Sequence, residues 1–118
     1  MTTTVTIEHF TINDTDWGTC TLLVEGFAQD DPDICAYTAD GEYLAPVTAS
    51  VSHAKPAEGC LLIENYGGGE ELLAALVDAG LVEPTGRTVA SGFVDLPEAR
   101  PLADLAAIIE HARQAASA

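Results

Sequence analysis

Basic residues are scarce in this sequence. Lysine and arginine occur only as Lys55, Arg87, Arg100 and Arg113, against 19 acidic residues among 118, which gives a formal net charge of −15 at pH 7. A negative field of this size repels phosphate backbones and anionic membranes, and it attracts basic proteins and cations. We therefore expect no direct binding to nucleic acid or membranes. The alternative explanation for the many acidic residues is that they serve only to keep the protein soluble.

Long apolar runs, export signals and paired cysteines are missing too. The longest strongly apolar stretches have about five residues, far fewer than the roughly 20 that a membrane-spanning helix needs. Residues 1–4 show neither the basic nor the apolar part of a signal sequence. The cysteines, Cys20, Cys35 and Cys60, are far apart, and their odd number favours reduced thiols. We expect a soluble, cytoplasmic protein with Cys20 and Cys60 in its core.

Signatures of catalysis and of metal binding are also absent. The glycines 67–69 lack the lysine of a phosphate-binding loop, and the glutamates that follow them would repel an anion. His9, His53 and His111 lack the spacing of a zinc site and are expected at the surface. Residues 30–33 lack the register of a calcium loop, so a solvated acidic turn is expected there. We expect no catalytic residue, cofactor or metal.

Hydrophobic residues make up 47% of the chain, which is enough for a core in one domain spanning residues 1–118. Apolar residues at helical spacing predict helices from Glu70 to Gly80 and from Pro101 onward, with Pro101 in the first turn. Asp40-Gly41 predicts a hairpin, and Pro84 to Gly86 a turn. Apolar alternation and short apolar runs predict strands at 3–12 with a bulge at 8–9, 19–26, 34–38, 43–51, 60–63 and 88–96.

These elements do not alternate regularly between strand and helix, and no internal repeat is present. Short connections between successive strands favour antiparallel pairing. We therefore predict an α+β fold, with an antiparallel sheet of about five to six strands and two helices packed on one face. Arg87 and Arg100, rare cations among many acids, are expected to form structural salt bridges.

Three segments between residues 34 and 100 form a recognisable pattern: Asp40-Gly41-Glu42, Gly59-Cys60, and EPTGRT at 83–88 followed by SGFV at 91–94. This stretch resembles a family of small proteins of uncharacterised domain, found on phages and on integrative and conjugative elements of gut and Gram-positive bacteria. The resemblance implies an accessory protein of a mobile element. Small acidic proteins in that setting are often anti-CRISPR or anti-restriction factors. No functional residue follows from this resemblance.

The function we expect is that of a non-enzymatic inhibitor. Its surface carboxylates would imitate the phosphates of DNA and bind a basic, nucleic-acid-handling defence protein. The predicted contact residues are Asp30, Asp31, Asp33, Asp40, Glu42, Glu70 and Glu71.

Two alternatives stay open. One is a non-catalytic interaction or regulatory module, either monomeric or homodimeric, and an exposed apolar patch would favour the homodimer. The other is a small enzyme, which a deep pocket with a histidine, or with a cysteine beside a carboxylate, would favour.

Overall fold

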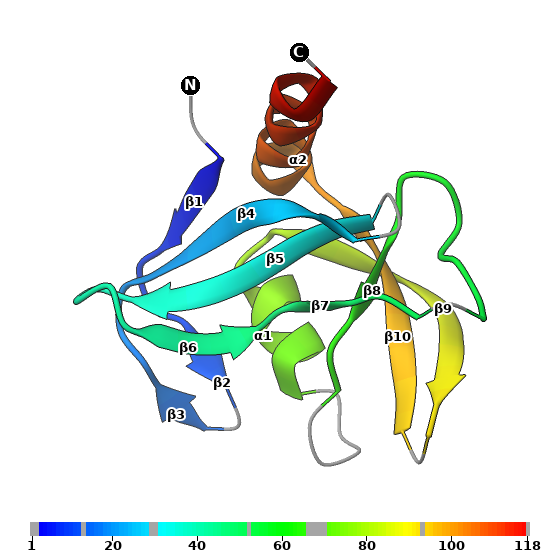
Figure 1. Ribbon diagram of the computed structural model, residues 1–118. Coiled ribbons are helices and arrows are strands. Elements are labelled where there is room, and N and C mark those ends of the chain that lie inside the picture. Colours follow the sequence, from blue (N-terminus) through cyan, green and yellow to red (C-terminus); the bar gives the residue numbers. More distant parts are fainter. Residues whose placement is uncertain are drawn as a thin grey trace.

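The structure is a computed structural model that describes residues 3–12, 14–28, 31–51, 53–65, 71–92 and 94–117. Within these ranges the strands form two four-stranded antiparallel sheets and a two-stranded ribbon (Figure 1). The first sheet has the order β1 (Thr4–Ile7), β4 (Cys20–Ala28), β5 (Asp31–Thr38), β6 (Tyr43–Pro46). The second has the order β7 (Thr48–Ala49), β8 (Leu61–Ile63), β10 (Val94–Pro101), β9 (Val82–Ser91). The ribbon pairs β2 (Thr11–Ile12) with β3 (Thr15–Asp16).

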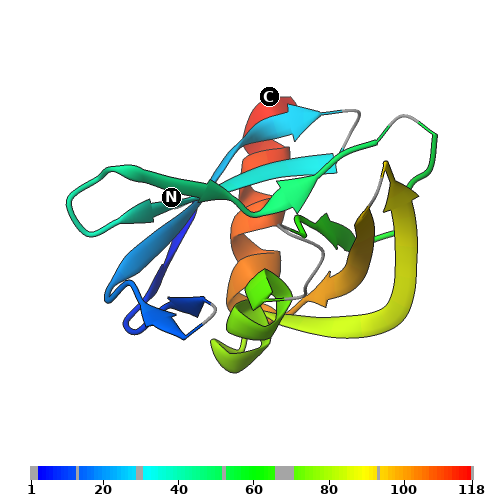
Figure 2. The ribbon, with the colours of Figure 1, turned by 90° about the horizontal axis from the view of Figure 1, so that it is seen from below.

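Two helices complete the described fold. Helix α1 (Glu71–Asp78) lies against β9 and β2, and α2 (Ala103–Ser117) lies against β1 and β4. Figure 2 shows α2 in the middle of the molecule, with the first sheet on one side and the second on the other. Both sheets and both helices contribute to one hydrophobic core, whose most buried members include Phe10, Leu22, Ile34, Ile63, Leu76 and Leu105.

The prediction of one sheet with both helices on the same face was therefore wrong. One cause lies in the strand predicted at 43–51, which changes sheets at Val47. The N–H of Val47 donates to the carbonyl of Ile34 in β5 at 2.8 Å, and its carbonyl accepts from Glu64, just after β8, at 2.9 Å. A single residue is thus hydrogen-bonded to both sheets, and alternation in the sequence does not reveal such a corner.

Thr48 completes this corner with its side chain. Its hydroxyl accepts from the N–H of Ile34 at 3.0 Å and donates to the carbonyl of Pro32 at 2.9 Å. The side chain is buried, so these two backbone groups of β5 have little access to water. Since buried backbone polar groups must be paired, the hydroxyl replaces the backbone partner that β5 loses where the chain turns toward β8.

The other cause lies in residues 82–101. The break at 91–92, predicted as an interruption of one strand, is the turn of a hairpin between β9 and β10, with Gly92 at φ 62°. The turn predicted at 84–86 is instead a bulge within β9, where three residues lie opposite Glu98. Pro101 ends β10, and α2 begins two residues later, so the predicted position of Pro101 in the helix was also wrong.

Other local predictions had mixed outcomes. The Asp40-Gly41 hairpin between β5 and β6 is confirmed, with Gly41 at φ 84°, and Gly80 follows α1 at φ 75°. Cys20 and Cys60 are buried and free, as expected. The bulge at 8–9 was wrong because β1 ends at Ile7 and pairs with β4, whereas residues 11–12 belong to the separate ribbon. The prediction of a solvated acidic turn at 30–33 was wrong for the residues that the structure describes, because residues 31–33 begin β5.

Replacing Thr48 by valine tests the corner. The variant keeps the size of the side chain but leaves the N–H of Ile34 and the carbonyl of Pro32 without this partner. We expect the free energy of unfolding to fall by about 1–3 kcal/mol, the cost of leaving buried polar groups unpaired. Urea unfolding of Thr48→Val measures it. Thr88→Val, at an exposed position of β9, is the matched control, and an equally small change in both variants would contradict the role of Thr48.

Candidate functional site

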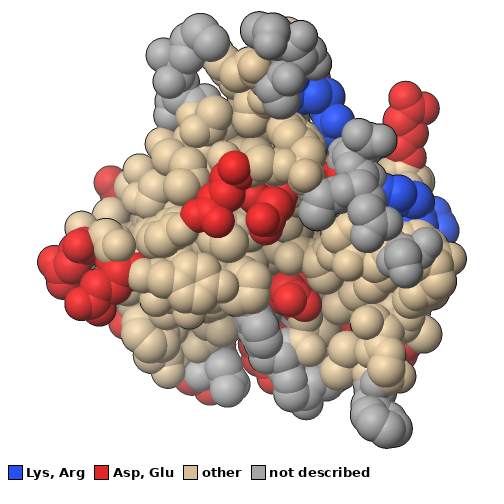
Figure 3. Space-filling model, viewed as in Figure 1, with Lys and Arg blue, Asp and Glu red and all other residues tan. Residues whose placement is uncertain are grey.

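The outer face of the first sheet combines aromatic and acidic side chains. Alternation along β5 places Ile34 and Ala36 in the core and directs its odd-numbered residues to the opposite face of the sheet, where Asp33 is exposed and Cys35 is buried beneath its neighbours. We call this surface the acidic tyrosine face, defined by Glu25, Asp33, Cys35, Tyr37 and Tyr43. Figure 3 shows acidic side chains over β4 and β5 and at the turn between β5 and β6, with basic side chains toward the upper right of the view.

A bulge in β4 brings Glu25 to this face. Val24 pairs with Ile34 and Gly26 pairs with Asp33, so Glu25 is the extra residue between two successive pairs. Its carboxylate accepts a hydrogen bond from the hydroxyl of Tyr37. The bulge therefore connects β4 to β5 through side chains as well as through the backbone.

The two tyrosines pack edge to face across β5 and β6. Their ring centroids are 5.8 Å apart and the rings are inclined by 78°. Tyr43 keeps 57% of its surface exposed, which makes it one of the most exposed large hydrophobic residues described. Aromatic side chains of this kind supply contact area with little loss of conformational entropy, and tyrosine is enriched among the residues that dominate binding energy.

The tyrosine hydroxyls and the thiol of this face keep their protons at neutral pH. The hydrogen bond to Glu25, followed by burial, raises the pKa of Tyr37 to about 12. Burial, followed by the charges of Glu25 and Asp33, raises the pKa of Cys35 to about 11. Burial also raises the pKa of Tyr43. A protonated thiol is a poor nucleophile, so this arrangement suits binding better than covalent catalysis.

The predicted contact residues do not all lie together. Asp33 is exposed on the acidic tyrosine face, and Asp40 and Glu42 are exposed in the turn between β5 and β6. Asp31 is instead bound to Lys55 at 3.2 Å, and Glu71 lies at the start of α1. The described contact residues thus belong to two parts of the fold, the β5–β6 hairpin and α1, and their role in binding a partner stays a prediction. Asp30 and Glu70 lie outside the described residues.

Sequence reasoning left Glu25, Tyr37 and Tyr43 out of the predicted contact set. The alternation in β5 places Asp33 and Tyr37 on the same face of the strand, which is a usable signal. The position of Glu25 depends on the bulge in β4, and nothing in the local sequence marks it.

The EPTGRT segment has a structural role. Glu98 of β10, only 1% exposed, lies opposite the bulge that this segment forms in β9. Its carboxylate accepts from Thr85 Oγ1 at 2.7 Å and from the N–H of Ala57 at 2.9 Å, and it pairs with Arg87 at 3.1 Å. The prediction that Arg87 and Arg100 form salt bridges is confirmed, since Arg100 pairs with Glu83 at 3.5 Å.

The environment of Glu98 favours its charged form. Burial alone would raise its pKa, but the hydrogen bonds from Thr85 and Ala57 and the charges of Arg87 and Arg100 outweigh burial and hold the pKa below its ordinary value. Glu98 thus joins the bulge of β9 to the segment that contains Ala57.

The histidines do not assemble a site in the described residues. His9 and His53 are exposed, as predicted; His9 lies 3.7 Å from Asp16, and a ring nitrogen of His53 lies 2.8 Å from the carbonyl of Ala90. His111 is only partly exposed on α2. Across the described ranges, no group of three histidine, cysteine or acidic side chains is placed to hold a metal ion.

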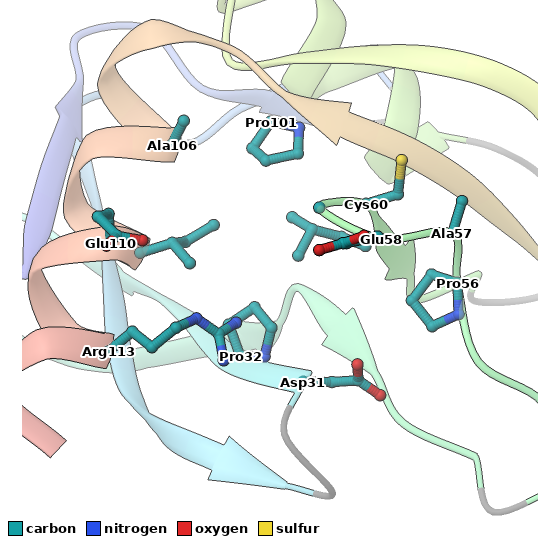
Figure 4. Close-up of a pocket in the computed structure, with 13 residues that line it drawn as sticks. Asp31, Pro32, Pro56, Ala57, Glu58, Cys60, Pro101, Ala106, Glu110 and Arg113 are labelled. Carbon is teal, nitrogen blue, oxygen red and sulfur yellow. The ribbon is translucent and has the colours of Figure 1, made fainter. Parts of the chain in front are cut away.

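A cleft of about 600 Å³ lies between α2, the start of β5 and residues 56–61. Its lining contains Cys60 and three carboxylates, Asp31, Glu58 and Glu110, together with Arg113 (Figure 4). A cysteine beside carboxylates is the feature that would favour an enzyme. No histidine is among the described residues that line this cleft, so the nucleophile and base pair of a thiol enzyme is not formed there.

Comparisons with known protein families, with curated proteins and with solved structures return no match. The resemblance to mobile-element proteins therefore stays a prediction. In the part of the chain that the structure describes, neither helix has the length and apolar character needed to span a membrane.

Replacing Glu98 by glutamine tests its buried charge. We expect the free energy of unfolding at pH 7 to fall by about 2–3 kcal/mol, because hydrogen bonds to charged groups contribute about 1.5–3 kcal/mol. The lowered pKa means that this contribution is present above the ordinary value of 4.5 and is lost as the pH falls through the folded-state pKa. Urea unfolding between about pH 7 and pH 3 measures it, and the two proteins should converge at low pH.

Glu83→Gln is the matched control, because Glu83 forms an ion pair in which both side chains are 62% exposed. Such a surface pair contributes about 1 kcal/mol or less. A difference between Glu98→Gln and the natural protein that stays constant with pH would show that Glu98 acts through packing rather than charge.

Proposed function

We propose that this protein is a non-catalytic inhibitor whose acidic tyrosine face binds a basic surface on a nucleic-acid-handling protein and blocks the site that nucleic acid would occupy. Because of the resemblance in sequence, we expect this partner to be a host defence protein of the kind that anti-CRISPR or anti-restriction factors inhibit. The observation that carries the proposal is the Tyr37–Tyr43 pair, with Tyr43 exposed and Tyr37 half-buried, and with Glu25 and Asp33 beside it.

In this arrangement, the charged groups and the aromatic contact area contribute to binding in different ways. The carboxylates attract a basic surface from a distance and raise the rate of encounter. The tyrosines then provide a contact that excludes water, which contributes most of the affinity in typical interfaces. Asp40 and Glu42, in the adjoining turn, extend the negative surface along the direction of β5 and β6.

A homodimeric regulatory module is less well supported. Among the residues that the structure describes, the exposed large hydrophobic ones are Trp17, just after the β2–β3 ribbon, Tyr43 on β6 and Val77 on α1. They belong to separate elements and do not form the single apolar patch that a stable dimer would use. A net charge of −15 on each copy also opposes self-association.

The test is capture of partners from a bacterial lysate, followed by competition with double-stranded DNA. We expect a basic DNA- or RNA-binding protein to bind at about 0.1 M salt, to weaken at about 0.5 M salt and to be displaced by DNA, because salt screens exposed charge pairs. The variant Asp33→Lys with Tyr43→Ala should weaken binding at least about 30-fold, since loss of a dominant contact costs about 2 kcal/mol or more.

Asp78→Lys is the matched control, because Asp78 is exposed at the end of α1 and the substitution makes the same change in charge. Circular dichroism establishes that each variant is folded. The proposal would be wrong if the captured partner were indifferent to DNA, or if Asp78→Lys weakened binding as much as the substitutions on the acidic tyrosine face.

A further inference from the structure

A shallow groove lies on the outer face of the first sheet, beside Tyr37. Its volume is about 300 Å³, at the lower end of the range that is typical of sites for whole small molecules. A groove of this size suits a single long side chain from a binding partner. Its lining comes from β1, β4, β5 and the turn between β5 and β6: Thr4, Thr21, Leu23, Tyr37, Thr38, Ala39 and Gly41.

Tyr37 forms the wall between this groove and Tyr43. In the register of the sheet, the neighbours of Tyr37 are Thr21 of β4 on one side and Tyr43 of β6 on the other. Tyr43 packs against the ring of Tyr37, and the groove lies on the β4 side. Because the hydroxyl of Tyr37 also donates to Glu25, the ring is held in place by two contacts before any partner binds.

The floor of the groove is apolar. Leu23 lies on the outer face of β4, where it pairs with Cys35 of β5, and it is half-buried. Ala39 adds a methyl group from the turn. Surface of this kind packs well against the hydrocarbon stem of a long charged side chain, whose charged end stays at the rim in contact with water.

The charge around the groove is negative. Glu25 lies at the hydroxyl end of Tyr37, and the turn that forms one wall carries Asp40 and Glu42, both of which are exposed. No basic residue is among the described residues that line the groove, and within the described ranges no ion pair involves these three carboxylates. A cationic side chain is therefore the complementary occupant.

We propose that the groove receives an arginine side chain of the basic partner, an inference that rests on the proposed function. The stem of the arginine packs on Leu23 and Ala39, and its guanidinium lies against the ring of Tyr37. The N–H groups of the guanidinium donate to the carboxylate of Glu25, which has further acceptor positions beyond the one that Tyr37 uses.

This arrangement favours arginine over lysine, although the two carry the same charge. A guanidinium is planar and weakly hydrated, so it can stack on an aromatic ring while its N–H groups donate in the plane to a carboxylate. The ammonium group of lysine is compact and strongly hydrated, and it loses more of its hydration in the same position. A preference for arginine thus separates the groove from a general attraction between charges.

The experiment is an NMR titration of the folded protein with two pentapeptides, Arg-Gly-Arg-Gly-Arg and Lys-Gly-Lys-Gly-Lys, each acetylated and amidated at its ends. The titration is made at about 0.05 M salt, where exposed charges are weakly screened. We expect the arginine peptide to bind about 5-fold more tightly, which corresponds to about 1 kcal/mol and is typical of a cation held against an aromatic ring. The signals of Leu23, Tyr37 and Ala39 should shift.

Two substitutions test the groove itself. Thr21→Leu fills it without a change in charge, and Glu25→Gln removes the carboxylate at its end. Each should reduce the preference for arginine to about 2-fold or less. The matched controls are Thr88→Leu, at an exposed position of β9, and Glu58→Gln, in an exposed segment away from the groove; both should keep the preference. Melting temperatures establish that the four variants are folded.

The inference is overturned if the two peptides bind equally, if Thr21→Leu keeps the full preference, or if a control variant loses it. Its failure is distinguishable from failure of the proposed function. Equal binding of the peptides, together with a captured partner that DNA displaces, would remove the arginine groove and leave the proposed function standing. A clear preference for arginine without any such partner would support the groove and count against the proposed function.

Discussion

The fold depends on the corner at Val47 and Thr48. Backbone groups of Val47 bond to both sheets, and the hydroxyl of Thr48 bonds to two backbone groups of β5 that the turning strand leaves behind. Without these bonds, burial of the junction would leave polar groups without partners, which is costly in a core. The corner lets the two sheets enclose α2 and a shared core. It also lies along the strand that begins with Tyr43, so it positions part of the acidic tyrosine face.

Much of the local structure was predictable from the sequence, whereas the arrangement of the sheets was not. Asp40-Gly41 predicted its hairpin because few other residues adopt the positive φ of such a turn, and the apolar periodicity predicted both helices. The corner at Val47 has no such mark, since a strand that changes sheets keeps its alternation. The hairpin at Gly92 was mistaken for an interrupted strand because the bulge opposite Glu98 hides the register between β9 and β10.

The candidate sites were predictable only in part. Composition indicated a negative surface, and of the five predicted contact residues that the structure describes, Asp33, Asp40 and Glu42 lie on or beside the acidic tyrosine face. The pairing of Asp31 with Lys55 was not predictable, because it depends on contact between segments that are far apart in the sequence. The cleft was not predictable for the same reason. Its walls come from both sheets and α2, and no pattern of residue spacing in the sequence indicates that these segments lie close together.

The hydrogen bond from Ala57 to Glu98 links the buried carboxylate to the cleft, because Ala57 lines that cleft beside Glu58. When Glu98 takes up a proton, its hydrogen bond with the N–H of Ala57 weakens, so the wall of the cleft that contains Ala57 is held less firmly. Any molecule that binds the ordered wall must then favour the ionised form of Glu98 and lower its pKa further, because coupling between two binding events is reciprocal. A ligand bound to this wall would therefore make the protein more resistant to acid than it is with the cleft empty.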